Sequence, residues 1–506
     1  MGTANTKLTR PPNSSGPPKR LNLDKLAARV SDLTLTDVEA DPTTVNIHTL
    51  CRWEDELLAD PKNRLALGAL TTHAATSILT NPTALRNDQH IFNHKLELEG
   101  SPVTNQRQSG RCWLFASTNV FRVGMMKKYK LSGFEFSQNY LFFWDKLEKA
   151  NFFLEQIIDT VDEPLDGRLV QSLLAGPVGD GGQWDMVVNL VEKYGLVPKT
   201  VYPDSYNATA SRNINWLITA KLREAALKVA KSADSETEKP TEAPAGDVRK
   251  YKLKVMQDIY GILALSLGAP PKPEDKFTWT YVDKDNKVHN LQTTPLAFYK
   301  DNIGAVSFVE SPKLGLYPKG GVGDRFSLVN DPRNPYMRLM TVERLGNVHG
   351  ARGIQYVNVD MTTLKNAVIA MIKAHIPVFF GCDVGKFSTS AKGIMDTKLF
   401  DYELGFNVTL NLDKAQRLQT GESAMTHAMV LSGVHIVDGK PTRWRVENSW
   451  GDQSGEKGYM MMTDAWMDEY CYQAVVEPHF VDKEVHEVLK QEPIVLPLWD
   501  PMGALA

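Results

Sequence analysis

Cysteine is scarce in this chain, with four residues among 506. Cys51, Cys382 and Cys471 stand in apolar or helical surroundings, without the spacing of a disulfide framework or a metal site, and we interpret them as packing residues. Histidine and the acidic residues show no metal-ligand spacing either, so we expect no metal and no cofactor. So low a cysteine content is typical of a reducing compartment and predicts a cytoplasmic protein.

Long apolar runs, internal repeats and a strong net charge are also missing. No apolar run of about 18 residues and no signal-peptide core occurs, so the sequence predicts no transmembrane segment. The net charge of −3 leaves no general basic surface for nucleic acid. The hydrophobic content of 42% and the charged content of 23% are typical of a globular protein with a sizeable core.

The first 45 residues are rich in Pro, Ser, Thr and Asn, with no acid before Asp24, so we expect a mobile N-terminal tail. The chain start, with Gly2 and Thr6, fits the pattern for N-myristoylation at Gly2, although so short a pattern is often met by chance. One acyl chain with nearby basic residues would give reversible membrane contact. The alternative is a mitochondrial presequence, and the prolines argue against the amphipathic helix that it requires.

The segment from Gln106 to Trp113, Gln-Arg-Gln-Ser-Gly-Arg-Cys-Trp, is the most informative part of the chain. The apolar residues that follow have helical spacing and predict a helix from Cys112 to about Lys130. A thiol in the first turn lies at the positive end of the helix dipole, which lowers its pKa and favours the nucleophilic thiolate. Taken alone, a cysteine before a tryptophan is more often a buried packing residue.

Two later segments supply an imidazole and an amide. His427 opens an apolar run, and Asn448 precedes Ser-Trp-Gly. Taken alone, His427 is typical of a histidine in a strand, and Asn448 is typical of a residue in a turn. Together with Cys112 they form the parts of a cysteine acyl-transfer site, in which Cys112 is the nucleophile and His427 the general base. Asn448 would orient the imidazole, and Gln106 would donate a hydrogen bond to the oxyanion.

The periodicity of apolar residues places helices and strands along the chain. Helices are expected near residues 50–58, 65–79, 112–130, 137–158, 183–194, 212–231, 248–267 and 361–375. Strands are expected at 91–96, in a hairpin over 277–292, and at 377–383, 427–437, 442–448 and 457–463. This pattern predicts an α+β protein whose site lies between a helical lobe, which carries Cys112, and an antiparallel sheet lobe, which carries His427 and Asn448 on adjacent strands.

The segments around Cys112, His427 and Asn448 resemble those of the papain-like cysteine proteases. Ser109 replaces a cysteine that forms a disulfide in the secreted members, and the gap from Cys112 to His427 is 315 residues (427 − 112), against roughly 130–150 in those members. Together with residues 181–186 (Gly-Gly-Gln-Trp-Asp-Met) and the final residues Asp-Pro-Met-Gly-Ala-Leu-Ala, the chain closely resembles the bleomycin hydrolase family, the cytosolic aminopeptidase branch. The resemblance extends from about residue 50 to the last residue.

The resemblance implies a papain-like two-lobed fold, with a helical lobe and an antiparallel β-sheet or barrel lobe, enlarged by helical insertions. The expected divisions are a tail over 1–45, a helical lobe over 46–205, a mostly helical insertion over 206–375 with a hairpin and an acidic loop at 232–247, a β lobe over 376–490, and a C-terminal arm over 491–506. Cys112, His427 and Asn448 would be the catalytic triad, and Gln106 would line the oxyanion hole. Gly181 and Gly182 would border the substrate cleft, where missing side chains let a peptide backbone come close.

In this family the last residues of the chain thread back into the active-site cleft. The resemblance therefore implies that the carboxylate of Ala506 pairs with the free ammonium of a peptide and directs removal of one N-terminal residue. From composition alone, docking of an apolar terminus on the surface is the simpler interpretation. Without the arm in the cleft, the enzyme would be an endopeptidase.

The resemblance also implies a homohexamer whose sites face an internal channel and admit peptides with a free N-terminus and small amides. Hydrolysis of the bleomycin carboxamide and of homocysteine thiolactone is implied in the same way. The alternative is a nucleic-acid-binding protein with secondary peptidase activity, since some members bind DNA or RNA through channel lysines. Basic segments are few here, chiefly Lys127-Lys128 and residues 249–254, and a solvated helix face is their simpler interpretation.

Overall fold

The structure is a computed structural model that describes residues 43, 45–233, 245–304, 307–311, 315–319 and 321–505. The chain forms two compact units, residues 1–78 and 79–506, which are described separately. The expected tail with Gly2, most of the expected acidic loop and Ala506 lie outside the described residues.

The first unit contains α2 (Ile47–Ala59) and α3 (Pro61–Leu70). Each helix begins at a side-chain cap, because the carboxamide of Asn46 and the carboxylate of Asp60 accept backbone N–H groups at 2.9 Å and 2.8 Å. The sequence predicted one helix over 65–79, but this helix stops at Leu70 and a separate α4 covers Ala75–Leu79. β-Branched threonines in residues 71–72 interrupt it, and their hydroxyls donate to carbonyls of the preceding turn.

The helical lobe of the second unit is built on α6 (Cys112–Lys128), α7 (Gln138–Asp159) and α9 (Trp184–Tyr194), close to the predicted ranges. The hydroxyl of Ser137 caps α7 by accepting a backbone N–H at 3.0 Å. Trp113 and Trp184 are fully buried in the core between these helices.

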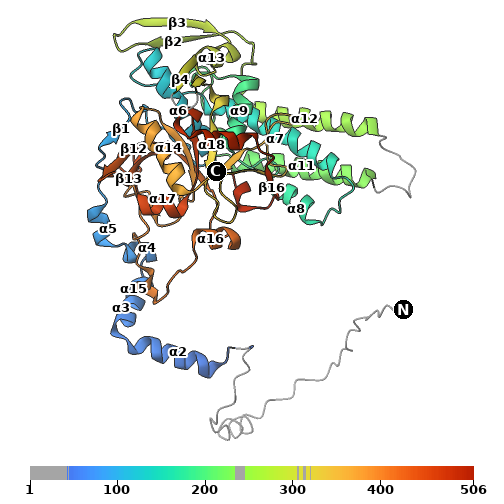
Figure 1. Cartoon of the computed structure of the whole chain (residues 1–506). Coiled ribbons are helices and arrows are strands. Elements are labelled where there is room, and N and C mark those ends of the chain that lie inside the picture. The colour runs from blue at the N-terminus through green and yellow to red at the C-terminus, as the bar shows by residue number, and fades with distance from the viewer. Residues whose placement is uncertain are drawn as a thin grey trace, which may run out of the picture. The chain divides into compact units, whose positions relative to one another are not determined.

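A pair of long helices, α11 (Arg212–Ala233) and α12 (Ala245–Leu267), packs beside α7 and extends away from the sheet (Figure 1). The predicted hairpin follows as β2 (Phe277–Val282) and β3 (Val288–Thr293). These elements confirm the helix and hairpin predictions for this part of the chain.

The main sheet draws its strands from the whole second unit. Its strands are β1 (His94–Lys95), β6 (Phe326–Val329), β7 (Arg338–Val342), β8 (Tyr356–Asn358), β9 (Val378–Cys382), β10 (Ser388–Thr389), β11 (Ile394–Met395), β12 (His427–Val437), β13 (Lys440–Glu447), β14 (Tyr459–Thr463), β15 (Cys471–Val476) and β16 (Ile494–Leu496). A separate hairpin joins β4 (Ser307–Ser311) to β5 (Gly315–Lys319). The strand expected over 91–96 is reduced to β1, which pairs with β12.

The order of the main sheet is β10-β11-β14-β13-β12-β9-β15-β6-β8-β7-β16. β9, β12 and β13 pair antiparallel, as predicted. Three pairs are parallel, namely β11 with β14, β6 with β8 and β7 with β16. The sheet is therefore mixed, since distant segments such as β16 join its edge, and its described strands form no closed barrel. The residues expected as an insertion contribute β6, β7 and β8.

The sheet is covered on both faces. Its side chains alternate between the faces, and each face packs into a separate core. Phe379 and Val430 face the core of the helical lobe, whereas Phe380 and Met429 face α14 (Met361–Lys373) and α17 (Asp464–Tyr470). α6 packs against β12 and β9. This contact brings the helix that Cys112 opens to the strand that His427 opens.

Short elements complete the described chain. The helices are α5 (Pro82–Asn87), α8 (Arg168–Ala175), α10 (Tyr206–Thr209), α13 (Pro295–Asn302), α15 (Tyr402–Phe406), α16 (Lys414–Thr420) and α18 (Lys483–Glu487). The 3-10 turns are η1 (Val322–Asp324), η2 (Pro478–Phe480), η3 (Val488–Lys490) and η4 (Pro501–Gly503). Within the described ranges, no helix has the length and apolarity needed to cross a membrane.

Candidate active site

Cys112 is the first residue of α6, so its backbone N–H belongs to the unbonded first turn of a 17-residue helix. The preceding residue, Arg111, is held by an ion pair with Asp204 at 2.7 Å. The side chain of Cys112 is only 2% exposed. The structure thus places this thiol at the predicted helix start, in a position with little access to water.

His427 and Asn448 lie on neighbouring strands and contact each other. His427 opens β12, Asn448 directly follows β13, and Nε2 of His427 lies 3.0 Å from Oδ1 of Asn448. The same oxygen accepts the N–H of Ser449 at 2.8 Å. Because this oxygen can only accept, His427 carries its proton on Nε2, which leaves Nδ1 able to take a proton. The Trp450 ring covers the imidazole, with 4.9 Å between the ring centres.

Burial is the main influence on the pKa of both Cys112 and His427. It raises the pKa of the Cys112 thiol to about 11, although the nearby backbone N–H groups of Ala428 and Trp113 oppose it. It lowers the pKa of His427 to about 4, against the effect of the hydrogen bond that His427 donates to Asn448. The sequence predicted a lowered thiol pKa, and the direction is opposite because the sulfur is shielded from water. Burial therefore makes the charged form of each group unfavourable.

Gln106 is held at both ends of its side-chain amide. Its Oε1 accepts the hydroxyl of Ser449 at 2.7 Å, and its Nε2 donates to the carbonyl of Ser109 at 2.7 Å. The backbone N–H of Gln106 also donates to the carbonyl of Ser449 at 2.8 Å. These bonds tie the segment before Cys112 to the segment after Asn448 and leave one amide N–H of Gln106 for a further acceptor.

Asp180 is a positioning residue that the sequence did not reveal. Its carboxylate accepts the N–H of Gly110 at 2.9 Å and the amide of Asn215 at 2.6 Å, and it forms an ion pair with Lys146 at 2.6 Å. Burial alone would raise the pKa of Asp180, but Lys146 and the hydrogen bonds outweigh it and hold the pKa well below its usual range. The only sequence signal is an aspartate within the glycine-rich residues 179–182.

Gly182 lies against the indole of Trp113, and a Cβ at this position would be 2.5 Å from the ring. The carbonyl of Gly181 accepts the ammonium of Lys149 at 2.6 Å. The missing side chain at Gly182 therefore permits close packing against Trp113, and a role of Gly181 and Gly182 at the border of a substrate cleft stays a prediction.

The C-terminal segment is anchored along its length. β16 pairs in parallel with β7. Asp500 caps η4 by accepting the N–H of Met502 at 2.8 Å, and it also forms an ion pair with Arg333 at 2.8 Å. The guanidinium of Arg168 lies 4.1 Å from the centre of the Trp499 ring. The segment is thus fixed to both lobes and is not a loose terminus.

The same segment ends beside the two glycines. Nε2 of Gln183, which follows Gly182, donates to the carbonyl of Ala504 at 2.8 Å. Leu505 packs on the core of the helical lobe. The described chain therefore ends close to the residues that pack beside the start of α6.

The other three cysteines are free thiols that form no disulfide. Cys382 and Cys471 are buried free thiols on the paired strands β9 and β15, as packing residues should be. Cys51 was expected to pack but is exposed, because no residue of α2 is buried. In the part of the chain that the structure describes, no group of three or more His, Cys, Asp and Glu could hold a metal ion.

Comparisons with known proteins identify the family and the fold. The model of the Peptidase C1-like family matches residues 44–503. Bleomycin hydrolase of Homo sapiens is 45% identical over 460 residues, which cover 89% of this chain and 96% of that protein. Cysteine proteinase 1, mitochondrial, of Saccharomyces cerevisiae is 42% identical over 473 residues, which cover 92% of this chain and 93% of that protein. The crystal structure of PepW from Lactobacillus rhamnosis is similar with a TM-score of 0.84 at 40% identity, covering 92% of this chain and 99% of that chain.

Proposed function

The chain belongs to the Peptidase C1-like family, and from that membership we propose that Cys112, His427 and Asn448 are its catalytic triad. Its similarity to bleomycin hydrolase and to a cysteine proteinase, on a shared fold, makes it a thiol-dependent aminopeptidase. The observation that carries the assignment of residues is the 3.0 Å contact between His427 and Asn448, on a strand packed against the helix that Cys112 opens.

In the proposed reaction, the Cys112 thiol gives its proton to Nδ1 of His427 while the sulfur attacks the substrate carbonyl carbon. The tetrahedral oxyanion accepts hydrogen bonds from the side-chain amide of Gln106 and the backbone N–H of Cys112. His427 then protonates the leaving amine, and a thioester remains. Water deprotonated by His427 attacks the thioester and releases the acid, while Asn448 keeps the imidazole oriented.

The C-terminal arm, residues 491–506, would restrict cleavage to the first peptide bond. The hydrogen bond from Gln183 to Ala504 supports this role, because it holds the arm beside Gly181 and Gly182 at the border of the substrate site. A chain end at Ala506 would place a carboxylate where it pairs with the ammonium of the substrate. Peptides with a free N-terminus would then be favoured over blocked ones.

The substrates that we propose are such peptides and small amides. The name of the human relative supports hydrolysis of the bleomycin carboxamide. Homocysteine thiolactone would be a substrate by the same chemistry, since its acyl carbon is already activated towards a thiolate.

Self-association is part of the proposal, and we expect a homohexamer. One side of α2 is apolar and largely exposed. It consists of Ile47, Leu50, Trp53 and Leu57, which are between 46% and 66% exposed. Apolar residues at this helical spacing in open solvent are typical of a surface that another chain covers.

The proposed location is the cytoplasm, with a mitochondrial fraction, since the yeast relative is named a mitochondrial proteinase. Myristoylation at Gly2 stays a prediction. The comparisons give no support to the nucleic-acid-binding alternative. Lys128, from one of the two basic segments, donates to the carbonyl of Asp301 and the amide oxygen of Asn302 at 2.8 Å, so it is already engaged within the protein.

Digestion of one peptide in free and N-acetylated form tests the proposal. The full chain should release single residues from the free peptide and leave the acetylated one intact. Removal of Leu505 and Ala506 should permit cleavage of the acetylated peptide, and an unchanged product ladder would refute the role of the arm. Cys112→Ala is the control for the nucleophile, and residual activity above about a thousandth of wild type would count against Cys112.

A further inference from the structure

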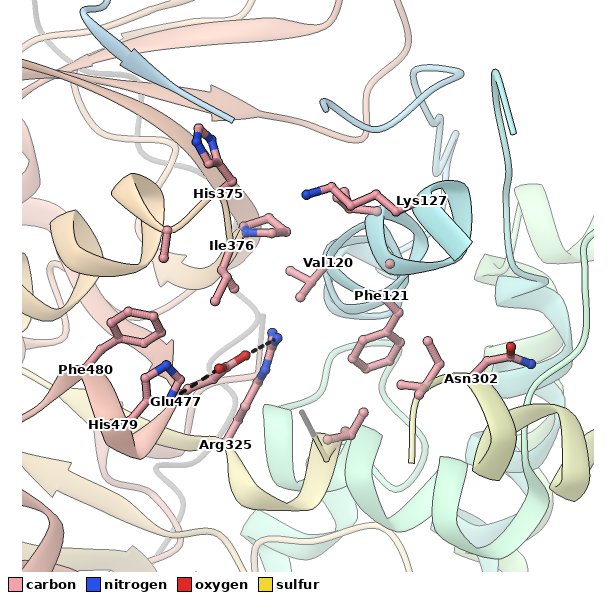
Figure 2. A pocket seen from close by; sticks show the side chains of 16 residues that line it. Val120, Phe121, Lys127, Asn302, Arg325, His375, Ile376, Glu477, His479 and Phe480 are labelled. Atoms are coloured by element: carbon pink, nitrogen blue, oxygen red, sulfur yellow. Dashed lines mark hydrogen bonds and ion pairs between the residues drawn. The ribbon is translucent and has the colours of Figure 1, made fainter. Parts of the chain in front are cut away.

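A cavity of about 610 Å³ lies at the far end of α6 from Cys112. Val120, Phe121 and Lys127 of α6 line one side, and Arg325 and other residues outside the helical core line the other (Figure 2). At 1.5 Å per residue, these α6 residues lie about 12–22 Å from Cys112 along the helix. The volume is typical of sites for small organic molecules. None of the proposed catalytic residues lines it.

Two cations converge on the cavity. Arg325 is 14% exposed, and its Nη2 donates to one carboxylate oxygen of Glu477 at 2.7 Å, while the other oxygen lies 3.7 Å from Nδ1 of His479. Lys127 extends from α6 towards the same space (Figure 2), and among the described residues it forms no ion pair. With neutral imidazoles, Lys127, Arg325 and Glu477 leave a net charge of +1.

Of the other polar side chains that line the cavity, Asn302, His375 and His479, His375 also presents a donor. His375 accepts the backbone N–H of Glu97 through Nδ1 at 3.1 Å, so its neutral ring carries the proton on Nε2. A ligand that presents an acceptor would therefore meet donors from three separate elements. Glu477 already neutralises Arg325, so the net charge of +1 comes from Lys127, and this favours a ligand with one negative charge over one with two.

We propose that this cavity binds an organic monocarboxylate with an aliphatic or aromatic body. The carboxylate pairs with Lys127 and with the edge of the Arg325 guanidinium that Glu477 does not use. The body lies against an apolar wall that includes Phe121 and Phe480. This assignment does not depend on the proposed function, because it concerns a different surface of the molecule.

The ligand would join the two lobes at the edge remote from the catalytic residues. Lys127 belongs to α6, whose other end is Cys112. Pro377, also at the cavity, leads into β9, whose last residue Cys382 pairs with His427. Occupancy should therefore be compatible with a bound peptide, which separates this site from the carboxylate position of the arm.

Isothermal titration calorimetry of the full-length Cys112→Ala protein, which should not hydrolyse an amide, with phenylacetate, and with phenylacetamide as a neutral probe of the same shape, tests the proposal. We expect a Kd of about 1 mM for phenylacetate and binding at least about tenfold weaker for the amide. Gly124→Leu fills the cavity, since a Cβ at Gly124 meets no atom within 4 Å, and should abolish binding. Gly261→Leu is the matched control, because Gly261 is an equally open position in α12, away from the cavity.

Lys127→Met gives a second variant that leaves the cavity open and should weaken phenylacetate binding about five- to tenfold. In Cys112→Ala protein, a saturating peptide should leave the affinity for phenylacetate unchanged. Equal binding of acid and amide would overturn the proposal, as would unchanged binding in Gly124→Leu or Lys127→Met. The absence of heat with phenylacetate at about 10 mM would overturn it as well.

Discussion

The ion pair between Arg122 and Glu447 offers a sharp test of how the two lobes hold the site together. Arg122 belongs to α6, and Glu447 is the last residue of β13, directly before Asn448. The two side chains are 1% and 3% exposed, and Nη1 of Arg122 also donates to the carbonyl of Pro102 at 2.6 Å. The pair therefore connects the helix of the proposed nucleophile to the strand that leads into the orienting amide.

We predict that Arg122→Met destabilises the fold by about 3–5 kcal/mol near pH 8, the usual cost of leaving a buried charge without its partner. Burial already raises the pKa of Glu447, and Arg122 is the first group that opposes it, so the pKa rises further without the guanidinium. A carboxyl whose pKa is higher in the folded than in the unfolded protein stabilises the fold below the unfolded value of about 4.3, and this stability is lost as the pH rises through the folded pKa. The destabilisation should therefore be smaller near pH 5 than near pH 8.

Urea unfolding followed by tryptophan fluorescence near pH 5 and near pH 8 measures both effects, provided that the m value is unchanged. The double variant Arg122→Met, Glu447→Leu replaces the pair by apolar groups and should regain most of the lost stability. A loss in Arg122→Met below about 1 kcal/mol near pH 8, or an equal loss at the two pH values, would refute the reasoning. A double variant that regains stability but not kcat would assign the pair a role in positioning Asn448.

Two further predictions concern the reacting groups and their support. Burial lowers the pKa of His427 to about 4, so the acid limb of kcat/KM should lie below the ordinary histidine value of about 6.5. The alkaline limb should follow the pKa of the substrate ammonium, about 8, and not that of Cys112, about 11. An alkaline limb whose pKa stays the same when the substrate amine is changed would contradict this. Asp180→Asn should lower stability by about 3–5 kcal/mol and also lower kcat, because the buried Lys146 loses its charge partner. Asp166→Asn, at an exposed position, is the matched control and should change neither quantity; an unchanged kcat in Asp180→Asn would remove its positioning role.

The helices and the hairpin over 277–292 can be predicted from sequence because their signals are local. In the hairpin turn, Asp283 accepts the N–H groups of Asp285 and Lys287 at 2.9 Å. Asn286 adopts a φ of 59°, a left-handed conformation that asparagine tolerates. The residues of the proposed triad can also be picked out of the sequence, since each stands in a short segment of unusual composition, although their distance in sequence gives no geometry.

The strands β6 and β15 cannot be predicted in this way, because each is buried on both faces and a polar residue interrupts its apolar run, unlike the continuous Val378-Phe379-Phe380 of β9. All four residues of β6 and all six of β15 are buried, so no alternation of polar and apolar residues marks them. Asp180 could not be identified from the sequence for a related reason. Its partners Gly110, Lys146 and Asn215 come from three separate segments, and only folding brings them together.

Cys112 and His427 are far apart in sequence, and this is compatible with one site. The backbone contacts that join the two segments lie before Cys112 and after Asn448, outside the intervening residues. The N–H of Gln106 donates to the carbonyl of Ser449 at 2.8 Å, and the N–H of Gly451 donates to the carbonyl of Thr104 at 3.0 Å. Gly451 has a φ of 83°, and a Cβ there would lie 2.5 Å from the amide nitrogen of Asn105, so only glycine fits. This short ladder joins the segment that carries Gln106 directly to the segment that follows Asn448. Segments inserted elsewhere between the two lobes can therefore add strands and helices without displacing either segment.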